Sequence, residues 1–117
     1  MKLLKNANVY TPAPLGKQDV LIEGEKILRI AEEIRGYEGL PDVEVYDLAG
    51  KTLVPAYIDL HVHITGGGGE QGPASRVPES TLSTFFKNGI TTVVGLLGTD
   101  GITRSLENLV AKARALT

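Results

Sequence analysis

With 117 residues, the chain has the length of one ordinary domain. Hydrophobic residues make up 42% of it and charged residues 22%, proportions that indicate a globular chain and exclude a disordered one. The formal net charge of -2 gives no reason to expect nucleic acid or an anionic membrane as a partner.

The chain contains no cysteine, which excludes disulfides and thiolate metal sites. No window approaches the roughly 18 apolar residues that a membrane-spanning helix needs. Residues 1–6 also lack the apolar stretch of a signal peptide. We therefore expect a cytoplasmic enzyme, or a fragment of one.

Residues 1–55 show the pattern of short strands separated by turns. Two apolar segments flank residues 23–26, a hairpin turn in which Gly24 can adopt a positive φ. A first strand is expected near residues 8–10, and residues 43–48 alternate imperfectly between apolar and polar. We predict a small antiparallel arrangement whose charged residues form a solvated face, without a catalytic constellation.

After Pro55 the pattern changes to alternating strands and helices. Residues 57–64 are rich in apolar and β-branched side chains and predict a strand, which a glycine-rich loop follows. Pro78 is expected to open a helix, because its missing N–H is no loss in a first turn. That helix is expected to end near Gly89, since glycine is a typical C-terminal cap.

Residues 90–98 form a second near-continuous apolar segment, and the stretch from about Thr103 places apolar residues on one helical face. Strands that are apolar on both faces are typical of parallel sheets covered by helices. We therefore expect an α/β fold in which residues 56–117 are the first two βα units of a TIM-type barrel. Such a barrel ordinarily takes about 250 residues, so the chain is expected to stop about a quarter of the way round it.

The chain has only two histidines, His61 and His63, which lie two apart on a predicted strand. Because side chains alternate along a strand, both imidazoles share a face with Asp59. At the C-terminal end of a barrel strand that face points to the barrel mouth, where catalytic groups lie. Two imidazoles there can bind one zinc ion at about 2.0–2.1 Å. The alternative is a pair of histidines hydrogen-bonded within a buried strand, and the metal site is the interpretation that we favour.

Three further residues near these histidines have both a structural and a functional interpretation. Asp59 either orients a metal ligand or fills the barrel floor as a hydrogen-bonded support, and the structural role is favoured. Glu70 is either a solvated loop carboxylate or the partner of a cationic substrate group, such as a free α-amino group. Thr99 either donates to a substrate carboxylate or caps a turn, and spacing alone favours the cap.

Four consecutive glycines, residues 66–69, follow the histidines. Glycines let the backbone approach a ligand closely and present its N–H and C=O groups. Gly67, Gly69 and Gly72 also match the G-x-G-x-x-G spacing of dinucleotide sites, but Pro73 interrupts the helix that such a site needs. No G-K-[ST] sequence follows, so neither a dinucleotide site nor a phosphate P-loop is expected.

Three segments carry a family resemblance. Residues 53–63, LVPAYIDLHVH, resemble the first barrel strand of the amidohydrolase superfamily, whose H-x-H pair binds the more buried metal. Residues 64–70, ITGGGGE, and residues 92–104, TVVGLLGTDGITR, resemble the isoaspartyl (β-aspartyl) dipeptidase family more specifically. The resemblance covers residues 50–117 strongly and the earlier residues in general plan, with Ala56 standing where glycine is common.

In that family a β-sandwich domain accompanies a (β/α)8 barrel that holds two zinc ions. The resemblance therefore implies that residues 1–55 are an N-terminal β-sandwich portion and that residues 56–117 begin a metal-dependent hydrolase barrel. It implies that His61 and His63 are two of the zinc ligands. A bridging carbamylated lysine, two further histidine ligands and the catalytic aspartate are expected outside these residues, so no catalytic residue is predicted within the chain.

The resemblance also assigns roles around the substrate. It implies that Gly68 contacts substrate through its backbone, that Glu70 holds the substrate α-amino group, and that Thr99 helps to hold the isoaspartyl end. The function implied is zinc-dependent hydrolysis of small isoaspartyl dipeptides by a homo-oligomer, with no nucleic acid or membrane partner.

Two alternatives remain. A cyclic amidohydrolase of the dihydroorotase or hydantoinase type shares the H-x-H pair. Those that resemble dihydroorotase usually carry arginine two residues after the second histidine, and Thr65 at that position argues against this reading. The other alternative is an inactive fragment, because the barrel is not closed and a tight zinc site needs three or four ligands. If the chain were the whole protein, we would expect no peptidase activity and only weak zinc binding.

Overall fold

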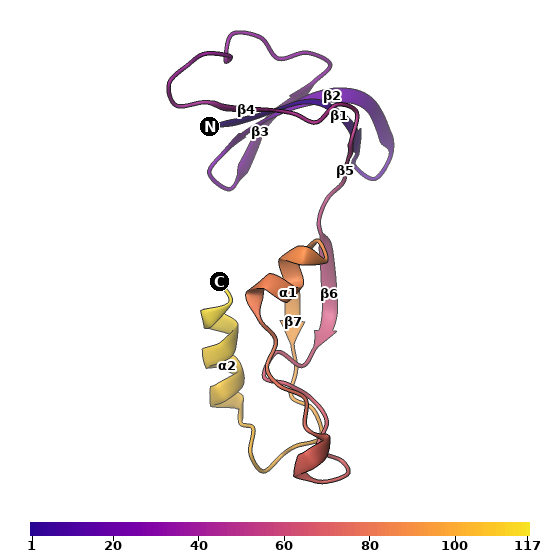
Figure 1. The fold of residues 1–117 in the computed structure, drawn as a ribbon, viewed down its shortest axis with the longest axis vertical. Helices are drawn as coiled ribbons and strands as arrows, with labels where there is room; N and C mark the ends of the chain where they lie inside the picture. The colour runs from indigo at the N-terminus through magenta and orange to yellow at the C-terminus, as the bar shows by residue number, and fades with distance from the viewer. The chain divides into compact units, whose positions relative to one another are not determined.

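The computed structural model describes all residues from 1 to 117, which divide into two compact units, Met1–Pro55 and Ala56–Thr117. The first unit consists of strands, and the second combines strands with helices (Figure 1). No helix in either unit is long and apolar enough to cross a membrane. That the units are a β-sandwich portion and the start of a barrel stays a prediction.

The first unit is a five-stranded sheet with the order β3-β2-β1-β4, in which β5 also pairs with β1. Its strands are β1 (Lys2–Tyr10), β2 (Pro14–Glu23), β3 (Lys26–Ala31), β4 (Glu44–Asp47) and β5 (Thr52–Leu53). The antiparallel prediction is confirmed for β1 to β3. It is wrong for β4 and β5, which run parallel to β1, because residues 32–43 form a long connection to β4 in place of a hairpin.

β1 is longer than the strand expected near residues 8–10. A bulge interrupts the alternation of apolar and polar residues, so the sequence pattern does not reveal the first half of the strand. Its register with β2 shifts between Leu4 and Ala7, where Asn6 has a φ of 57°. The extra residue turns the later side chains to the other face. Leu3 and Ala7 are therefore both fully buried, although they belong to different clusters.

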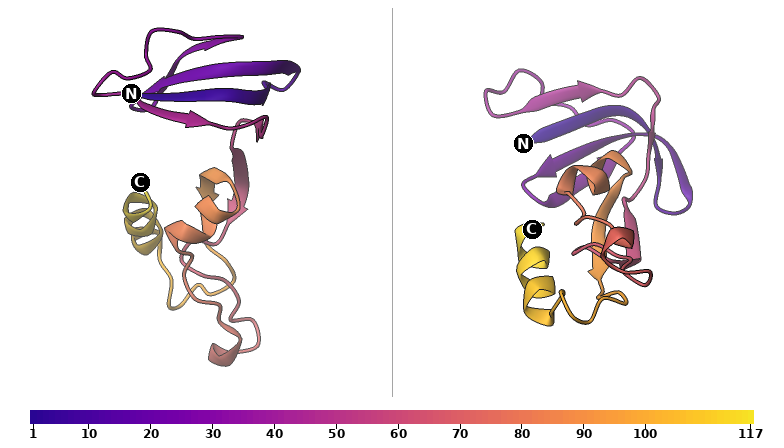
Figure 2. Two further views of the ribbon diagram at one scale, coloured as in Figure 1. Left: turned by 45° about the horizontal axis from the view of Figure 1, so that its top comes forward. Right: turned by 60° about the horizontal axis from the view of Figure 1, so that its bottom comes forward.

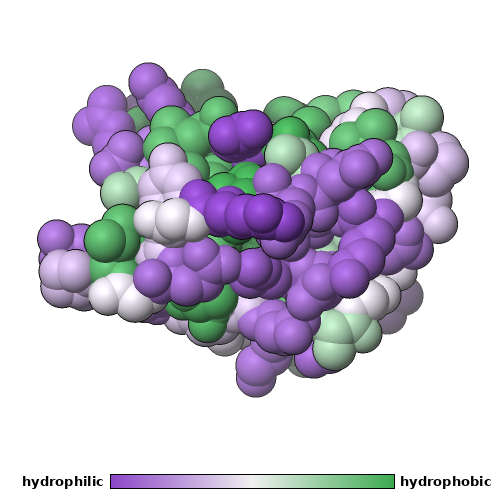
Figure 3. All heavy atoms as spheres, turned by 90° about the horizontal axis from the view of Figure 1, so that it is seen from above, coloured by the Kyte–Doolittle hydropathy of each residue, from purple (hydrophilic) through white to green (hydrophobic).

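The sheet buries apolar side chains on both of its faces. The two clusters of fully buried residues are Leu3, Leu21 and Ile34, and Ala7, Val9 and Val20. Val20 and Leu21 are neighbours on β2 and so point to opposite faces. On the face of the molecule drawn in Figure 3, hydrophilic residues predominate and hydrophobic ones form smaller groups between them.

Asp19 departs from the solvated face expected of the charged residues in this unit. Its side chain is buried, and its two carboxylate oxygens accept hydrogen bonds from the backbone N–H of Asn6 at 2.9 Å and of Ile34 at 3.0 Å. These partners lie at the bulge of β1 and just after β3. Because a buried carboxylate needs such donors, Asp19 acts as a structural group that ties the two segments together.

The second unit alternates strands and helices. Its elements are β6 (Tyr57–Val62), the 3-10 helix η1 (Pro73–Ser75), α1 (Leu82–Lys87), β7 (Ile90–Gly95) and α2 (Leu106–Ala115). β6 and β7 pair in parallel, as predicted. Both α-helices lie on the same side of this strand pair (Figures 1 and 2). The arrangement is that of two successive βα units.

The strands of this unit are covered on one side only, although their apolar composition is typical of strands buried on both faces of a complete sheet. Tyr57, Ile58 and Leu60 are 64 to 70% exposed in β6. Two βα units are expected to leave one sheet face poorly covered, and these exposures agree with that expectation. Both α-helices, α1 and α2, lie on one side of the pair, and this unit has no further strand or α-helix for the other side.

Both helices begin later than the sequence suggests. Pro78 does not open α1, because the segment before the helix is bonded to the glycine-rich loop: Val77 N–H donates to Gly67 O at 2.9 Å, and Ser80 N–H donates to Ile64 O at 3.1 Å. α1 therefore starts only at Leu82. α2 starts at Leu106, after Ser105 caps it by accepting a hydrogen bond from a backbone N–H at 3.2 Å.

Candidate functional site

The candidate site lies where β6 and β7 end. In a parallel pair the carboxyl ends of both strands meet at one edge, and Leu96 N–H extends the pairing by donating to Val62 O at 2.8 Å. His63 directly follows β6, and Thr99 follows β7 after a short irregular stretch. Ligands of parallel α/β sheets and barrels bind at such an edge.

The two imidazoles lie close together. The ring centroids of His61 and His63 are 5.2 Å apart, with the rings perpendicular. His63 is partly buried and His61 is exposed. His63 Nδ1 lies 3.3 Å from Leu96 O, and a carbonyl can only accept, so this bond requires the proton on Nδ1 and leaves Nε2 free as a ligand.

This donor set fits part of a zinc site. Two neighbouring imidazoles match the nitrogen ligands that zinc prefers. No group of three or more His, Cys, Asp or Glu side chains that could hold a metal ion occurs in the structure. The chain therefore offers two candidate ligands, and a zinc site needs at least one more protein ligand.

Asp59 is partly buried within β6, on the strand that carries the histidine pair. Its carboxylate accepts a hydrogen bond from His61 N–H at 3.1 Å. The side chain thus braces the backbone of the strand that carries His61. Its suggested role as a support of the metal ligands stays a prediction.

The glycine loop needs its glycines for two separate reasons. Gly66 and Gly68 have positive φ values of 89° and 69°, at which a residue with a side chain would be strained. A Cβ at Gly66 would also lie 2.2 Å from Val77 O, and one at Gly68 would lie 2.3 Å from Ser75 O. The loop therefore folds tightly against residues 72–77, where the Ser75 hydroxyl accepts hydrogen bonds from Gly69 N–H and Gln71 N–H at 3.2 Å each.

The three residues expected to bind substrate come together beside His63. The Thr99 hydroxyl donates to Gly68 O at 3.4 Å. The pKa of Glu70 lies below its usual value, chiefly because its own backbone N–H stabilises the carboxylate, then because of the Thr99 hydroxyl, with His63 contributing less. An ionised carboxylate and a backbone carbonyl side by side can accept hydrogen bonds from an ammonium group.

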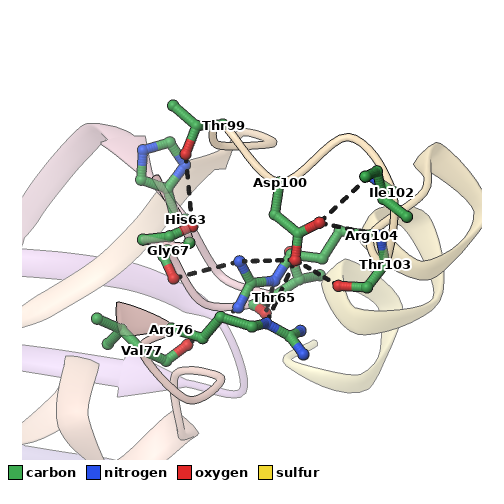
Figure 4. Close-up of polar contacts among 12 residues, drawn as sticks. His63, Thr65, Gly67, Arg76, Val77, Thr99, Asp100, Ile102, Thr103 and Arg104 are labelled. Carbon is green, nitrogen blue, oxygen red and sulfur yellow. Dashed lines mark hydrogen bonds and ion pairs between the residues drawn. The ribbon is translucent and has the colours of Figure 1, made fainter. Parts of the chain in front are cut away.

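A second polar cluster behind the loop is not predicted by the sequence analysis. Figure 4 shows the Arg104 guanidinium between the glycine loop and the Asp100 carboxylate. Thr103 donates to Asp100 through its hydroxyl and through its N–H at 2.9 Å, and Arg76 pairs with the carboxylate at 3.2 Å. These hydrogen bonds from Thr103, ahead of the attraction of Arg76, lower the pKa of Asp100 to about 2.

The sequence holds one signal for this cluster, the DGIT run of residues 100–103. Aspartate followed by such residues is typical of a turn in which the carboxylate accepts nearby N–H groups. Nothing in the sequence indicates that Arg104, next to the turn, reaches a loop more than thirty residues earlier.

No protein-family model matches the chain. Among solved structures, it is similar to the beta-aspartyl dipeptidase of Fervidobacterium islandicum AW-1, with 52% identity, a TM-score of 0.89, and coverage of 98% of this chain and 31% of that one. A second structure of that dipeptidase, in complex with a beta-Asp-Leu dipeptide, matches equally well and is covered over 30% of its length.

The similarity extends to hydrolases of cyclic amides. A dihydroorotase of Staphylococcus aureus is 32% identical over 111 residues, which are 95% of this chain and 25% of that protein. A D-hydantoinase of a Thermus species is 27% identical with a TM-score of 0.69, over 99% of this chain and 24% of that one. The chain thus spans about a quarter to a third of the length of these relatives.

Together these findings show that the chain is similar to the N-terminal portion of amidohydrolases, over a β-rich first unit and the parallel βα units that follow it. Within that class, the resemblance to isoaspartyl dipeptidases that the sequence predicts is confirmed at 52% identity over nearly the whole chain.

Proposed function

We propose that the protein hydrolyses isoaspartyl dipeptides and that this chain supplies two zinc ligands and one wall of the substrate pocket. The observation that carries the proposal is the convergence of Gly68, Glu70 and Thr99 beside His63. The similarity to a beta-aspartyl dipeptidase, one structure of which contains beta-Asp-Leu, supports it.

An isoaspartyl dipeptide carries a free α-ammonium and a free α-carboxylate on the residue whose side chain forms the amide. The ammonium is the group that distinguishes it from an internal peptide. Glu70 pairs with this ammonium, and Gly68 O accepts a further hydrogen bond from it. Because the pKa of Glu70 is lowered, the carboxylate is ionised throughout the neutral range in which the ammonium is charged.

The Thr99 hydroxyl has one proton to donate. The hydroxyl shares that proton between Gly68 O, at the long distance of 3.4 Å, and the Glu70 carboxylate, whose pKa it helps to lower. A bound substrate carboxylate is a stronger acceptor than a carbonyl oxygen, so it draws the hydroxyl away from Gly68 O, while the Glu70 carboxylate pairs with the ammonium. Thr99 and Gly68 thereby hold the two charged groups of the isoaspartyl end at a fixed separation.

His61 and His63 hold one zinc ion of the complete site, with the Nε2 atom of His63 as a ligand. When bound, zinc polarises the scissile carbonyl and activates water near neutral pH. The bond from His63 Nδ1 to Leu96 O fixes the ring orientation and tautomer. Leu96 lies just beyond β7, so the second strand orients a ligand that belongs to the first.

Hydrolysis of a cyclic amide is the second candidate, because a dihydroorotase and a D-hydantoinase match the chain over 95 to 99% of its length. Thr65 stands where arginine would grip the carboxylate of dihydroorotate. Its side chain is 2% exposed, and its hydroxyl is buried without a hydrogen-bond partner. A short buried side chain cannot replace that arginine, which favours the dipeptide.

The test is a substrate panel with the zinc-loaded protein at its full natural length. We expect turnover of beta-Asp-Leu and none of alpha-Asp-Leu, N-acetyl-beta-Asp-Leu, dihydroorotate or hydantoin. Loss of activity on the N-acetylated dipeptide isolates the role of the ammonium. Turnover of a cyclic amide without turnover of beta-Asp-Leu would replace the proposal with the second candidate.

A further inference from the structure

Arg104 is a buried charge that donates to an unusual set of acceptors. Arg104 as a whole is only 6% exposed to solvent. Its Nε donates to Thr65 O at 3.0 Å, its Nη1 to Gly67 O at 3.2 Å and its Nη2 to Val77 O at 3.1 Å. All three are backbone carbonyls, and the first two alternate with Gly66 along the loop. A planar guanidinium can satisfy three divergent acceptors at once, which an ammonium cannot.

The guanidinium lies so close to the loop that no side chain fits at Gly66. A Cβ at Gly66 would lie 2.8 Å from Arg104 Nη2. The loop and the guanidinium therefore fit each other, and the loop path depends on both. Without the arginine, the carbonyls of Thr65 and Val77 would lose the donor that the guanidinium supplies, and Gly67 O would keep only its bond from Val77 N–H.

Asp100 places a negative charge beside the other side of the guanidinium. Its side chain is 10% exposed, with Oδ2 lying 3.8 Å from Arg104 Nη1 and 3.2 Å from Arg76 Nε. Hydrogen bonds from Ile102 N–H and Thr103 N–H at 3.2 and 2.9 Å hold the carboxylate itself in place. Asp100 directly follows Thr99. The short segment 99–104 therefore contacts Gly68 through Thr99 at one end and the loop backbone through Arg104 at the other.

A loop of four glycines has more backbone freedom to lose than any other sequence of its length. Gly67 O, which Arg104 holds, belongs to the peptide that leads into Gly68. A displacement of about 1 Å in a positioning element can lower activity by about 100-fold. Restraint of this backbone therefore bears directly on the direction of Gly68 O and Glu70.

We propose that Arg104, oriented by Asp100, is a positioning residue that sets the glycine loop so that Gly68 and Glu70 face the substrate ammonium. This inference rests on the proposed function. It does not make Arg104 a catalytic residue, because all three of its hydrogen bonds go to backbone carbonyls.

The experiment compares Arg104→Lys with Arg114→Lys, the same exchange at an exposed position of α2, in the zinc-loaded protein at its full natural length. We expect Arg104→Lys to raise KM for beta-Asp-Leu about 10-fold or more, with zinc content unchanged, and Arg114→Lys to leave both unchanged. Asp100→Asn, a milder change, should raise KM in the same direction. An unchanged KM in both Arg104→Lys and Asp100→Asn overturns the proposal.

A double-mutant cycle separates positioning from a general loss of stability. If Arg104 acts through Glu70, Arg104→Lys costs much less kcat/KM in a Glu70→Gln background than in the wild type. A structural role alone gives the same fold loss in both backgrounds, and that result contradicts the inference.

Hydrogen exchange tests the same inference without turnover. We expect the amides of residues 66–72 to exchange about 10-fold faster in Arg104→Lys than in Arg114→Lys, with β1 to β3 unchanged. If beta-Asp-Leu is not a substrate, the proposed function fails, while faster exchange would still support the loop restraint. Unchanged exchange refutes the restraint whatever the substrate is.

Discussion

Glu70 is the residue on which the proposed selectivity depends. It is exposed, ionised through its own N–H and the Thr99 hydroxyl, and close to the histidine pair. Substitution Glu70→Gln keeps the shape and removes the charge that faces the ammonium. We expect kcat/KM for beta-Asp-Leu to fall about 10- to 100-fold, mainly through KM, because a charged hydrogen bond is lost.

Glu79 provides the matched control for that substitution. It is also an exposed glutamate of the second unit, but it pairs with Lys112 at 2.9 Å. Surface pairs of this kind contribute little to stability, so Glu79→Gln should leave the steady-state constants unchanged. Equal effects of the two substitutions would show that Glu70 has no specific role.

Asp100 gives a pH dependence with a definite sign. Its folded pKa of about 2 lies below its ordinary value, so the folded state favours the ionised form. The resulting stability is present above the unfolded pKa of about 3.9 and is lost as the pH falls from there to about 2. We expect the urea midpoint of the metal-free protein to fall over this range more steeply than that of Asp100→Asn, with the two curves converging at low pH. Parallel curves would contradict the assignment.

At the scale of elements, Gly95 is a position where β7 leaves no room for a side chain between Ile64 and Leu109 of α2. A Cβ at Gly95 would lie 2.7 Å from Ile64 Cδ1 and 3.3 Å from Leu109 Cδ1. Ile64 is fully buried and has little room to move. We expect Gly95→Ala to destabilise the protein by about 1–3 kcal/mol through overpacking, measured by urea unfolding. The control is Gly101→Ala, where a Cβ meets nothing within 4 Å; equal losses at both positions would refute the packing argument.

Elements fixed by local chemistry could be predicted from the sequence. The hairpin between β2 and β3 turns at Gly24, whose φ is 55°, and α1 ends before Gly89, whose φ is 70°. Elements that depend on distant partners could not. The direction of β4 depends on the path of residues 32–43, and the start of α1 depends on hydrogen bonds from Val77 and Ser80 to the loop.

The same division applies to the candidate site. Residue types and spacing were enough to single out His61 and His63 and to raise Glu70 and Thr99 as candidates. The resemblance added Gly68 and favoured the functional interpretation of Glu70 and Thr99. Sequence reasoning missed Arg104, because its partners are backbone carbonyls from Thr65, Gly67 and Val77, and carbonyls carry no residue signature. A side chain that binds backbone can be recognised only when the fold is known.

At the scale of the molecule, the exposed apolar surface of the second unit needs an explanation. Tyr57, Ile58 and Leu60 on β6 and Leu106 on α2 are each more than 60% exposed. Large exposed apolar surfaces mark interaction sites. Since the chain spans 24 to 31% of the length of its relatives, we expect further βα units of a (β/α)8 barrel to cover these faces in the protein at its full natural length.

Metal binding connects this expectation to the two histidines. Zinc that binds only the folded state stabilises that state, and a tight site requires ligands beyond the two imidazoles of this chain. In the protein at full natural length, we therefore expect a chelator to abolish hydrolysis of beta-Asp-Leu and to lower Tm, with both restored by zinc. The double variant His61→Ala, His63→Ala should lose about one zinc ion per chain and show a smaller Tm response to zinc. The chain has no other histidine. Unchanged zinc content in this variant would therefore show that the histidines of this chain do not bind zinc.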